Sequence, residues 1–145
     1  MLHRKLRIGD LIYNYEQRKI VCVDTQIISE LQKDNNLEKF RRIPLNSKWL
    51  KKVFEFDSRY LSMQYMTVYT SRVNGIKIHE QRLGFFLSCT FRDKIKTELG
   101  EGLHISKPKI VYVDELMTYL TLLNNQEFAF EDNLSDLNNL FHEDY

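Results

Sequence analysis

The sequence predicts an α+β fold with a curved, mainly antiparallel sheet, two main helices and a short acidic C-terminal segment. Stretches rich in β-branched and aromatic residues, separated by polar turns, predict the sheet. Two stretches with apolar residues at helical spacing predict the helices. The length of 145 residues and the hydrophobic content of 43% are typical of a single globular domain. We therefore expect one α+β domain over residues 1–128, followed over residues 129–145 by an acidic tail or a short docked helix.

The N-terminal stretch predicts a β-hairpin. Leu6 and Ile8, continuing into residues 11–13, form its first strand, and residues 20–23 form its second. The link between them, "NYEQRK", is short and polar, as hairpin turns are. An opening of the form "RIGDLIY…KIVCVD" is typical of a small SH3-like barrel or a curled sheet. The polar segment "QKDNNLEK" then predicts a loop.

The first predicted helix covers Ser47–Phe54. Pro44 favours an extended approach, and Asn46 or Ser47 can accept a hydrogen bond from a free backbone N–H at the helix start. The helix would bury one stripe of apolar residues, namely Trp49, Leu50, Val53 and Phe54.

The middle of the chain predicts two strands, "YLSMQYMTVYTSR" and "GIKIHEQRLGFFLSCTF". In the first, Leu61, Met63 and Tyr65 alternate with polar residues, which is the pattern of a half-buried strand. Asn74–Gly75 predicts the turn between the two strands, because both residues tolerate positive φ.

The second predicted helix covers Glu115–Asn124 and follows a strand over residues 110–113. Asp114 stands where an N-cap belongs, so we expect it to begin the helix rather than to perform chemistry. Asn124–Asn125 can end the helix in a left-handed cap. The buried face would hold the residues spaced i, i+3, i+4 and i+7, namely Leu116, Tyr119, Leu120 and Leu123.

Charge is divided unevenly along the chain, although the net charge is only +1. Residues 1–110 carry a net +9, whereas residues 111–145 carry a net −8 and no Lys or Arg. Such asymmetry indicates a polyanionic partner or a tail that folds back on a basic body. The alternative is two solvated surfaces that differ in sign.

Two segments are candidate binding sites. The segment "KFRRIPLNSKWLKK" contains no acid, and it would contact nucleic-acid phosphates through Lys39, Arg41, Arg42, Lys48, Lys51 and Lys52. An exposed Trp49 would let a base stack, but its place on the apolar stripe favours the core instead. In the tail, an apolar stripe would either pack on the body or order on a partner protein, and it consists of Leu134, Leu137, Leu140 and Phe141.

The sequence shows no motif for catalysis, for a metal or for a cofactor, so we predict no catalytic residue, no metal site and no cofactor. The four histidines are scattered, and Cys22 and Cys89 lie in apolar stretches typical of buried reduced thiols. A site assembled from distant residues would leave no such signature. With no secretion signal and no apolar run of membrane-spanning length, we expect a cytoplasmic protein, in the host cytoplasm if phage-encoded, and no membrane association.

The segments "RRIPLNSKWLKKVFEF" and "KIVYVDELMTYLTLLNNQEF" resemble small proteins of gut Bacteroidota, their phages and mobile elements. The resemblance extends thinly over residues 6–128. That family often has His in place of Asp114 and Gly in place of Asn125, which fits structural roles at both positions. The resemblance implies a phage or mobile-element setting and no particular activity.

Three functions remain open on these observations. The first is a small non-enzymatic binding protein that acts on a protein partner or on an identical subunit. The second is a nucleic-acid or nucleotide binder that uses the basic body, with the acidic tail as competitor. The third is a small enzyme without a local motif.

Overall fold

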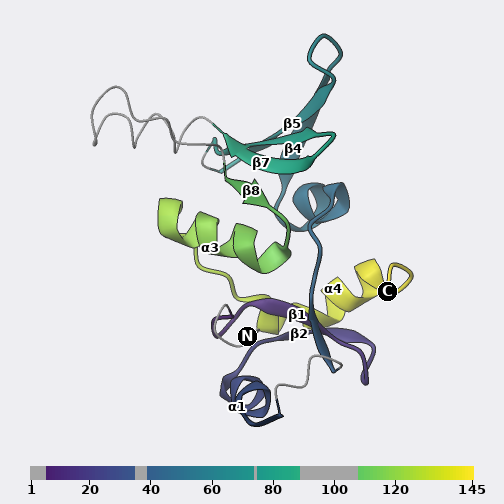
Figure 1. Cartoon of the computed structure of the whole chain (residues 1–145), viewed down its shortest axis with the longest axis vertical. Helices are drawn as coiled ribbons and strands as arrows, with labels where there is room; N and C mark the ends of the chain where they lie inside the picture. Colours follow the sequence, from purple (N-terminus) through teal and green to yellow (C-terminus); the bar gives the residue numbers. More distant parts are fainter. Residues whose placement is uncertain (1–5, 35–38, 74, 89–107) are drawn as a thin grey trace. The chain divides into compact units, whose positions relative to one another are not determined.

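A computed structural model describes residues 6–34, 39–73, 75–88 and 108–145 (Figure 1). The chain forms two compact units. Unit 1 consists of Met1–Pro44 and Tyr112–Tyr145, and unit 2 consists of Leu45–Val111. Unit 2 is therefore one continuous segment of the chain, and it is inserted between the two segments that make up unit 1.

Unit 1 contains a three-stranded antiparallel sheet in the order β2-β1-β3, with β1 at Leu11–Asn14, β2 at Lys19–Cys22 and β3 at Phe40–Arg42. The predicted hairpin is confirmed, with Ile12 opposite Val21. Its turn is held by Asn14, whose side-chain oxygen accepts the backbone N–H groups of Glu16 and Gln17 at 3.0 and 3.1 Å. The first strand begins later than expected, because Gly9 with φ +95° turns the chain just before it.

Helix α1, at Thr25–Asp34, was not predicted from the sequence. The carboxylate of Asp24 accepts the backbone N–H of Ile27 at 2.8 Å, as an N-cap does. The run of β-branched residues before Asp24 favoured a strand and hid this start signal. The apolar face of α1 completes the core of unit 1, where Leu31 packs with Leu6, Ile12, Val23 and Phe40.

Helix α3, at Val113–Asn124, begins two residues before the predicted start, and Asp114 is not its N-cap. The N-cap position is Tyr112, whose backbone N–H donates to the carboxylate of Glu115 at 3.2 Å. Glu115 is thus the third helical residue rather than the first. The left-handed cap is confirmed, since Asn125 has φ +51°.

Helix α4, at Leu134–Phe141, packs on β2, the outer strand of the unit 1 sheet (Figure 1). A short 3-10 helix, η3, precedes it at Phe130–Asp132. The Asn138 amide accepts the N–H of Ile20 at 2.7 Å and donates to the Ile20 carbonyl at 3.1 Å. One side chain therefore satisfies both backbone groups of a residue on the sheet edge. The C-terminal segment is docked on the hairpin.

Unit 2 begins with a short helical segment over residues 47–53, of which Trp49–Val53 forms the π-helical turn η2. The side-chain oxygen of Asn46 accepts the Trp49 N–H at 3.1 Å, so the predicted start signal is confirmed. Trp49 and Leu50 are buried, as the apolar stripe requires.

A five-stranded antiparallel meander follows in unit 2, with β4 at Phe56–Leu61, β5 at Met66–Ser71, β6 at Lys77–Gln81, β7 at Gly84–Ser88 and β8 at Lys109–Ile110. Turns at residues 62–65 and 82–83 divide each of the two predicted strands. In the turn between β5 and β6, Gly75 has φ +71° as expected, whereas Asn74 lies outside the described residues. Cys89, His3 and His104 also lie outside them.

The predicted α+β class is confirmed, with two antiparallel sheets in place of one. The described strands close no barrel, so the SH3-like form expected of the N-terminal part is not seen in them. Instead, α4 covers the outer strand of the first sheet.

We expect Phe141→Ala to lower the free energy of unfolding by about 3–5 kcal/mol, because the ring is 1% exposed in the core of unit 1. Leu140→Ala is the matched control, since its neighbouring side chain is 36% exposed, and it should cost less than about 1 kcal/mol. Urea unfolding of both variants measures the difference. Equal effects would contradict the docking of α4.

Candidate functional site

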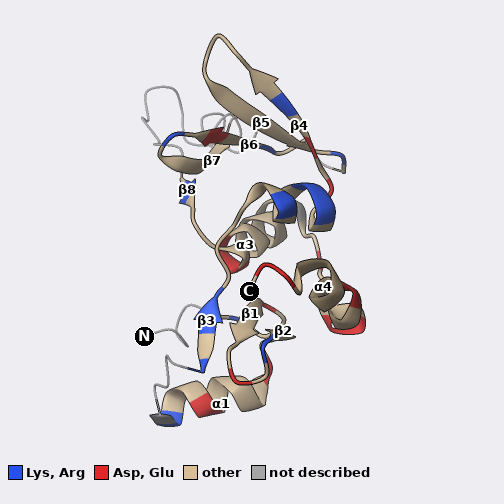
Figure 2. Cartoon of the chain, turned by 90° about the vertical axis from the view of Figure 1, so that its right-hand side faces the viewer, with Lys and Arg blue, Asp and Glu red and all other residues tan. Residues whose placement is uncertain are grey.

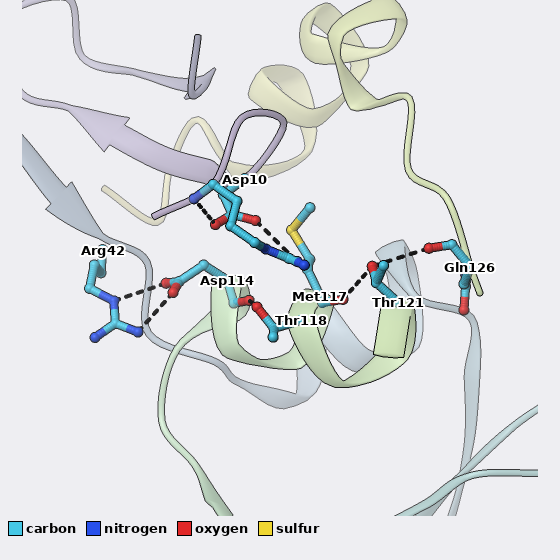
Figure 3. Close-up of polar contacts among 8 residues, drawn as sticks. Asp10, Arg42, Asp114, Met117, Thr118, Thr121 and Gln126 are labelled. Atoms are coloured by element: carbon cyan, nitrogen blue, oxygen red, sulfur yellow. Dashed lines mark hydrogen bonds and ion pairs between the residues drawn. The ribbon is translucent and has the colours of Figure 1, made fainter. Parts of the chain in front are cut away.

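In unit 1, the half-buried Arg42 forms an ion pair with the buried Asp114 (Figure 3). The guanidinium donates to both carboxylate oxygens, from Nε at 3.0 Å and from Nη2 at 2.7 Å. Its central carbon lies 4.1 Å from the centroid of the Tyr112 ring. Glu115 adds a second carboxylate at 3.5 Å from Nη2. This bidentate and stacked geometry is specific to arginine.

The local fold explains why these groups meet. Arg42 ends β3, and Asp114 stands in the first turn of α3, 72 positions away. Next to them, the Val113 N–H donates to the Ile43 carbonyl at 2.9 Å, and Pro44 forms a β-bridge with Tyr112. A strand end and a helix start are thereby joined through both backbone and side chains.

Asp10 is a second buried carboxylate of unit 1 (Figure 3). It accepts the backbone N–H of Arg7 at 2.8 Å, and the Arg7 guanidinium lies 3.7 Å away. Burial raises the pKa of Asp10, and the negative charge of Asp114 raises it further. The hydrogen bond and charge of Arg7, with the charge of Arg42, oppose this rise in pKa only in part.

Arg42 and Asp114 form a structural clamp between β3 and α3. Burial disfavours the charged form of Arg42, but the hydrogen bond and charge of Asp114 more than offset this and raise the Arg42 pKa. The guanidinium therefore stays charged and hydrogen-bonded to the Asp114 carboxylate. A concavity of about 310 Å³ lies beside the clamp, lined by Arg7, Thr121 and Phe128 among others. The Asp10 carboxyl is almost fully buried, so little of it faces that space.

The structure divides the six predicted phosphate-binding cations between the two units. In unit 1, Arg42 is held by Asp114, Lys39 lies 3.4 Å from Glu30 and 3.8 Å from Glu16, and Arg41 stacks on Tyr15. In unit 2, Lys51 and Lys52 are exposed on η2, and Lys48 is half-buried (Figure 2). The segment therefore does not form one basic surface within either unit.

Most apolar residues of the two predicted binding sites are buried or half-buried within the fold. Trp49 is fully buried and offers no stacking surface for a base. Leu137 and Phe141 are buried, and Leu134 is half-buried. Of the predicted partner-binding stripe, Leu140 is the most open residue.

The described nucleophilic side chains include the free Cys22 thiol in unit 1 and a buried serine next to a histidine in unit 2. Burial raises the pKa of the Cys22 thiol to about 11, with help from Glu131 and Asp24, so the thiol stays protonated. His79 and Ser88 form a buried contact of 3.1 Å in unit 2. No cluster of three His, Cys, Asp or Glu residues suited to a metal ion occurs among the described residues. None of the described helices has the length and apolar character needed to cross a membrane.

Three large exposed side chains lie close together in sequence at the β4–β5 hairpin of unit 2, whereas Ile8 and Leu122 in unit 1 are exposed singly. Tyr60, Met63 and Tyr65 are 63%, 88% and 82% exposed. Tyr65 has φ +52° in the turn, a conformation that costs a bulky residue backbone strain. Leu83 is also exposed, in the turn between β6 and β7 at the same end of the meander. We call Tyr60, Met63 and Tyr65 the hairpin surface.

Sequence reasoning missed the hairpin surface for a physical reason. Alternation at Leu61, Met63 and Tyr65 resembles a strand with one buried face, but the last two residues belong to a turn. The turn "SMQY" contains no Gly, Pro, Asn or Asp, so it carries no sequence signal.

Comparisons of the chain with protein families, with curated proteins and with solved structures found no match.

We expect Arg42→Met to lower the free energy of unfolding by about 3–5 kcal/mol, because it leaves the Asp114 charge buried without its partner. Arg41→Met is the matched control, since Arg41 is exposed and stacks on Tyr15, and it should cost about 1 kcal/mol or less. Adding Asp114→Leu to Arg42→Met should recover part of the loss. Urea unfolding of all three variants measures this, and equal costs for the two single variants would contradict the clamp.

Asp10 should make stability depend on pH. Its raised pKa means that the folded protein holds a proton to higher pH than the unfolded chain, whose ordinary carboxyl pKa is 3.8. The stabilising contribution of Asp10 is therefore complete below that value and is lost as pH rises through the folded-state pKa. Asp10→Asn keeps an acceptor for the Arg7 N–H but cannot ionise.

Urea unfolding of the wild type and Asp10→Asn from about pH 4 to about pH 7 tests this expectation. The wild type should lose stability relative to the variant as pH rises. A difference that is constant across the range would show that burial does not shift the Asp10 carboxyl.

Proposed function

We propose that the protein is a small non-enzymatic binding protein that uses the hairpin surface of unit 2 to contact a protein partner. The observation that carries this proposal is the exposure of three large side chains, Tyr60, Met63 and Tyr65, on one hairpin. Single exposed apolar residues are ordinary, but a group of them marks an interaction surface. Tyrosine and methionine are enriched at the centres of protein interfaces.

The backbone at Tyr65 supports the same function. A left-handed conformation is disfavoured for a bulky residue by about 1–2 kcal/mol, and Gly or Asn would occupy the position more easily. A tyrosine at this point costs stability and gains nothing in packing, since its side chain is 82% exposed. Strain at an exposed aromatic residue is explained if the ring contacts something outside the chain.

The charged groups of unit 1 favour binding over catalysis. Arg42, Asp114 and Asp10 all have partners in the fold, and the Cys22 thiol is protonated at neutral pH. The cations of unit 1 and the buried Trp49 also give little support to nucleic-acid recognition. A cytoplasmic setting in a phage or mobile element belongs to this proposal, and the sequence resemblance supports the phage or mobile-element part of it.

Photo-crosslinking tests the proposal directly. With p-benzoylphenylalanine at position 65 of the full chain in cells, we expect a discrete crosslinked protein that survives nuclease treatment. Val73 is the matched control position, because it is also apolar and exposed but lies in the turn between β5 and β6, at the other end of the meander. Crosslinks of equal yield at positions 65 and 73, or none at 65, would contradict the proposal. Crosslinks that disappear with nuclease would favour a nucleic-acid partner.

Tyr65→Gly separates binding from folding. The variant removes the ring and relieves the positive-φ strain, so we expect unchanged or slightly higher thermal stability. In the same variant, the partner crosslinked from position 63 should be lost or strongly reduced. A large fall in thermal stability would show that Tyr65 serves the fold instead.

A further inference from the structure

β4 is an edge strand of the unit 2 sheet, and its outer side is open in the described structure. The sheet order places β5 on one side of β4 and no described strand on the other. Residues 57–60 are exposed, and β4 is six residues long. Long exposed edges usually carry devices that prevent pairing, because their backbone groups are a template for another strand.

The register shows which backbone groups face the open edge. The Ser71 N–H donates to the Ile76 carbonyl at 2.8 Å, so the Ser71 backbone groups face β6 rather than β4. Phe56 lies opposite Ser71, and antiparallel pairs alternate between bonded and non-bonded. It follows that Phe56, Ser58 and Tyr60 direct their N–H and C=O groups outward.

The side chains of β4 are self-complementary about Ser58. Asp57 and Arg59 flank it and share the opposite face of the strand from Ser58. If two β4 strands pair antiparallel with Ser58 on the axis, each Asp57 lies opposite the Arg59 of the second copy. Figure 2 shows the two signs of charge at separate points on β4. In this register Phe56 lies opposite Tyr60, and each outward pair exchanges two backbone hydrogen bonds.

The neighbouring registers are disfavoured by the same charges. A twofold axis at Asp57 places two carboxylates opposite each other, and an axis at Arg59 does the same to two guanidinium groups. The charges therefore select one register rather than blocking the edge. Arg59 forms no ion pair with any residue that the structure describes, whereas Asp57 has an exposed pair with Arg72 at 2.9 Å.

We propose that the protein forms a twofold-symmetric dimer in which the β4 strands of two copies pair antiparallel about Ser58. The interface is isologous, so each contact occurs twice and the assembly closes at two copies. This inference goes beyond the proposed function, because it uses the strand edge and names a second copy of the chain as the partner. Tyr60 belongs to both surfaces, but the dimer is tested at positions 57–59 and the hairpin surface at positions 63 and 65, so the two proposals can fail independently.

A charge-swap experiment on the full chain tests the dimer. Sedimentation velocity over a concentration series should show a reversible dimer for the wild type. Asp57→Arg alone and Arg59→Asp alone each place like charges opposite each other, and each should weaken dimerisation by about tenfold or more. An equimolar mixture of the two variants should restore a dimer, because every cross-strand pair is then opposite in sign.

Arg82→Asp is the matched control, since it makes the same charge change at an exposed residue in the turn between β6 and β7, off the β4 edge. It should dimerise like the wild type. Circular dichroism and thermal unfolding establish that each variant is folded. A dimer that is unaffected by the single variants, or not restored in the mixture, would place the contact elsewhere.

Cysteine crosslinking detects the dimer even if it is weak or a charge variant fails to fold. In a background with Cys22→Ser and Cys89→Ser, Ser58→Cys lies on the proposed axis. The Cβ atoms of a hydrogen-bonded antiparallel pair are about 5.5 Å apart, which is long for a disulfide but within reach of a short bis-maleimide. This reagent should link Ser58→Cys into a covalent dimer much faster than Ser62→Cys in the turn. If Ser58→Cys forms no such dimer and the wild type stays monomeric, this inference fails, whereas crosslinks from position 65 to another protein would still support the proposed function.

Discussion

A buried guanidinium requires a carboxylate beside it, and in unit 1 Arg42 has Asp114. The pair joins the end of β3 to the first turn of α3, and the backbone bond from Val113 to Ile43 follows the same path. Replacing such a pair with apolar groups often costs little folding stability. The pair therefore contributes less to stability than to fixing where α3 meets β3. In the observed placement of α3, Arg42 donates two hydrogen bonds to Asp114, and the remaining C-terminal segment continues from that placement.

The C-terminal segment then covers the edge of the sheet that the N-terminal segment forms. Asn138 satisfies the outer backbone groups of Ile20, and Phe141 fills the core beside the hairpin. The segment with a net charge of −8 thus belongs to the folded body of unit 1 (Figure 2). Asp114 is buried against Arg42, whereas Glu131, Asp132 and Asp136 lie on the exposed side of elements whose apolar residues are buried.

The two units treat their exposed strands differently. In unit 1 the outer strand β2 is covered by α4, whereas in unit 2 the strand β4 has no described strand on its outer side. Unit 2 also holds the exposed aromatic and methionine side chains of the hairpin surface. The free energy falls when another chain pairs with unmatched backbone groups or covers exposed apolar surface. Both features of unit 2 belong to the proposals made for it, whereas Arg42, Asp114 and Asp10 in unit 1 have partners within the fold.

The sequence by itself determined the α+β class, the N-terminal hairpin, the cap at Asn46 and the left-handed end of α3, because each depends on residues within one turn of one another. Only the tertiary structure decided the role of Asp114, because its partner Arg42 is 72 positions away. From local spacing alone, Asp114 fits the role of a helix cap equally well. The same holds for Met63 and Tyr65, whose alternation predicts burial. Whether such a pattern lies on a covered strand or in an open turn depends on which distant residues pack against it. The neighbouring sequence does not contain that information.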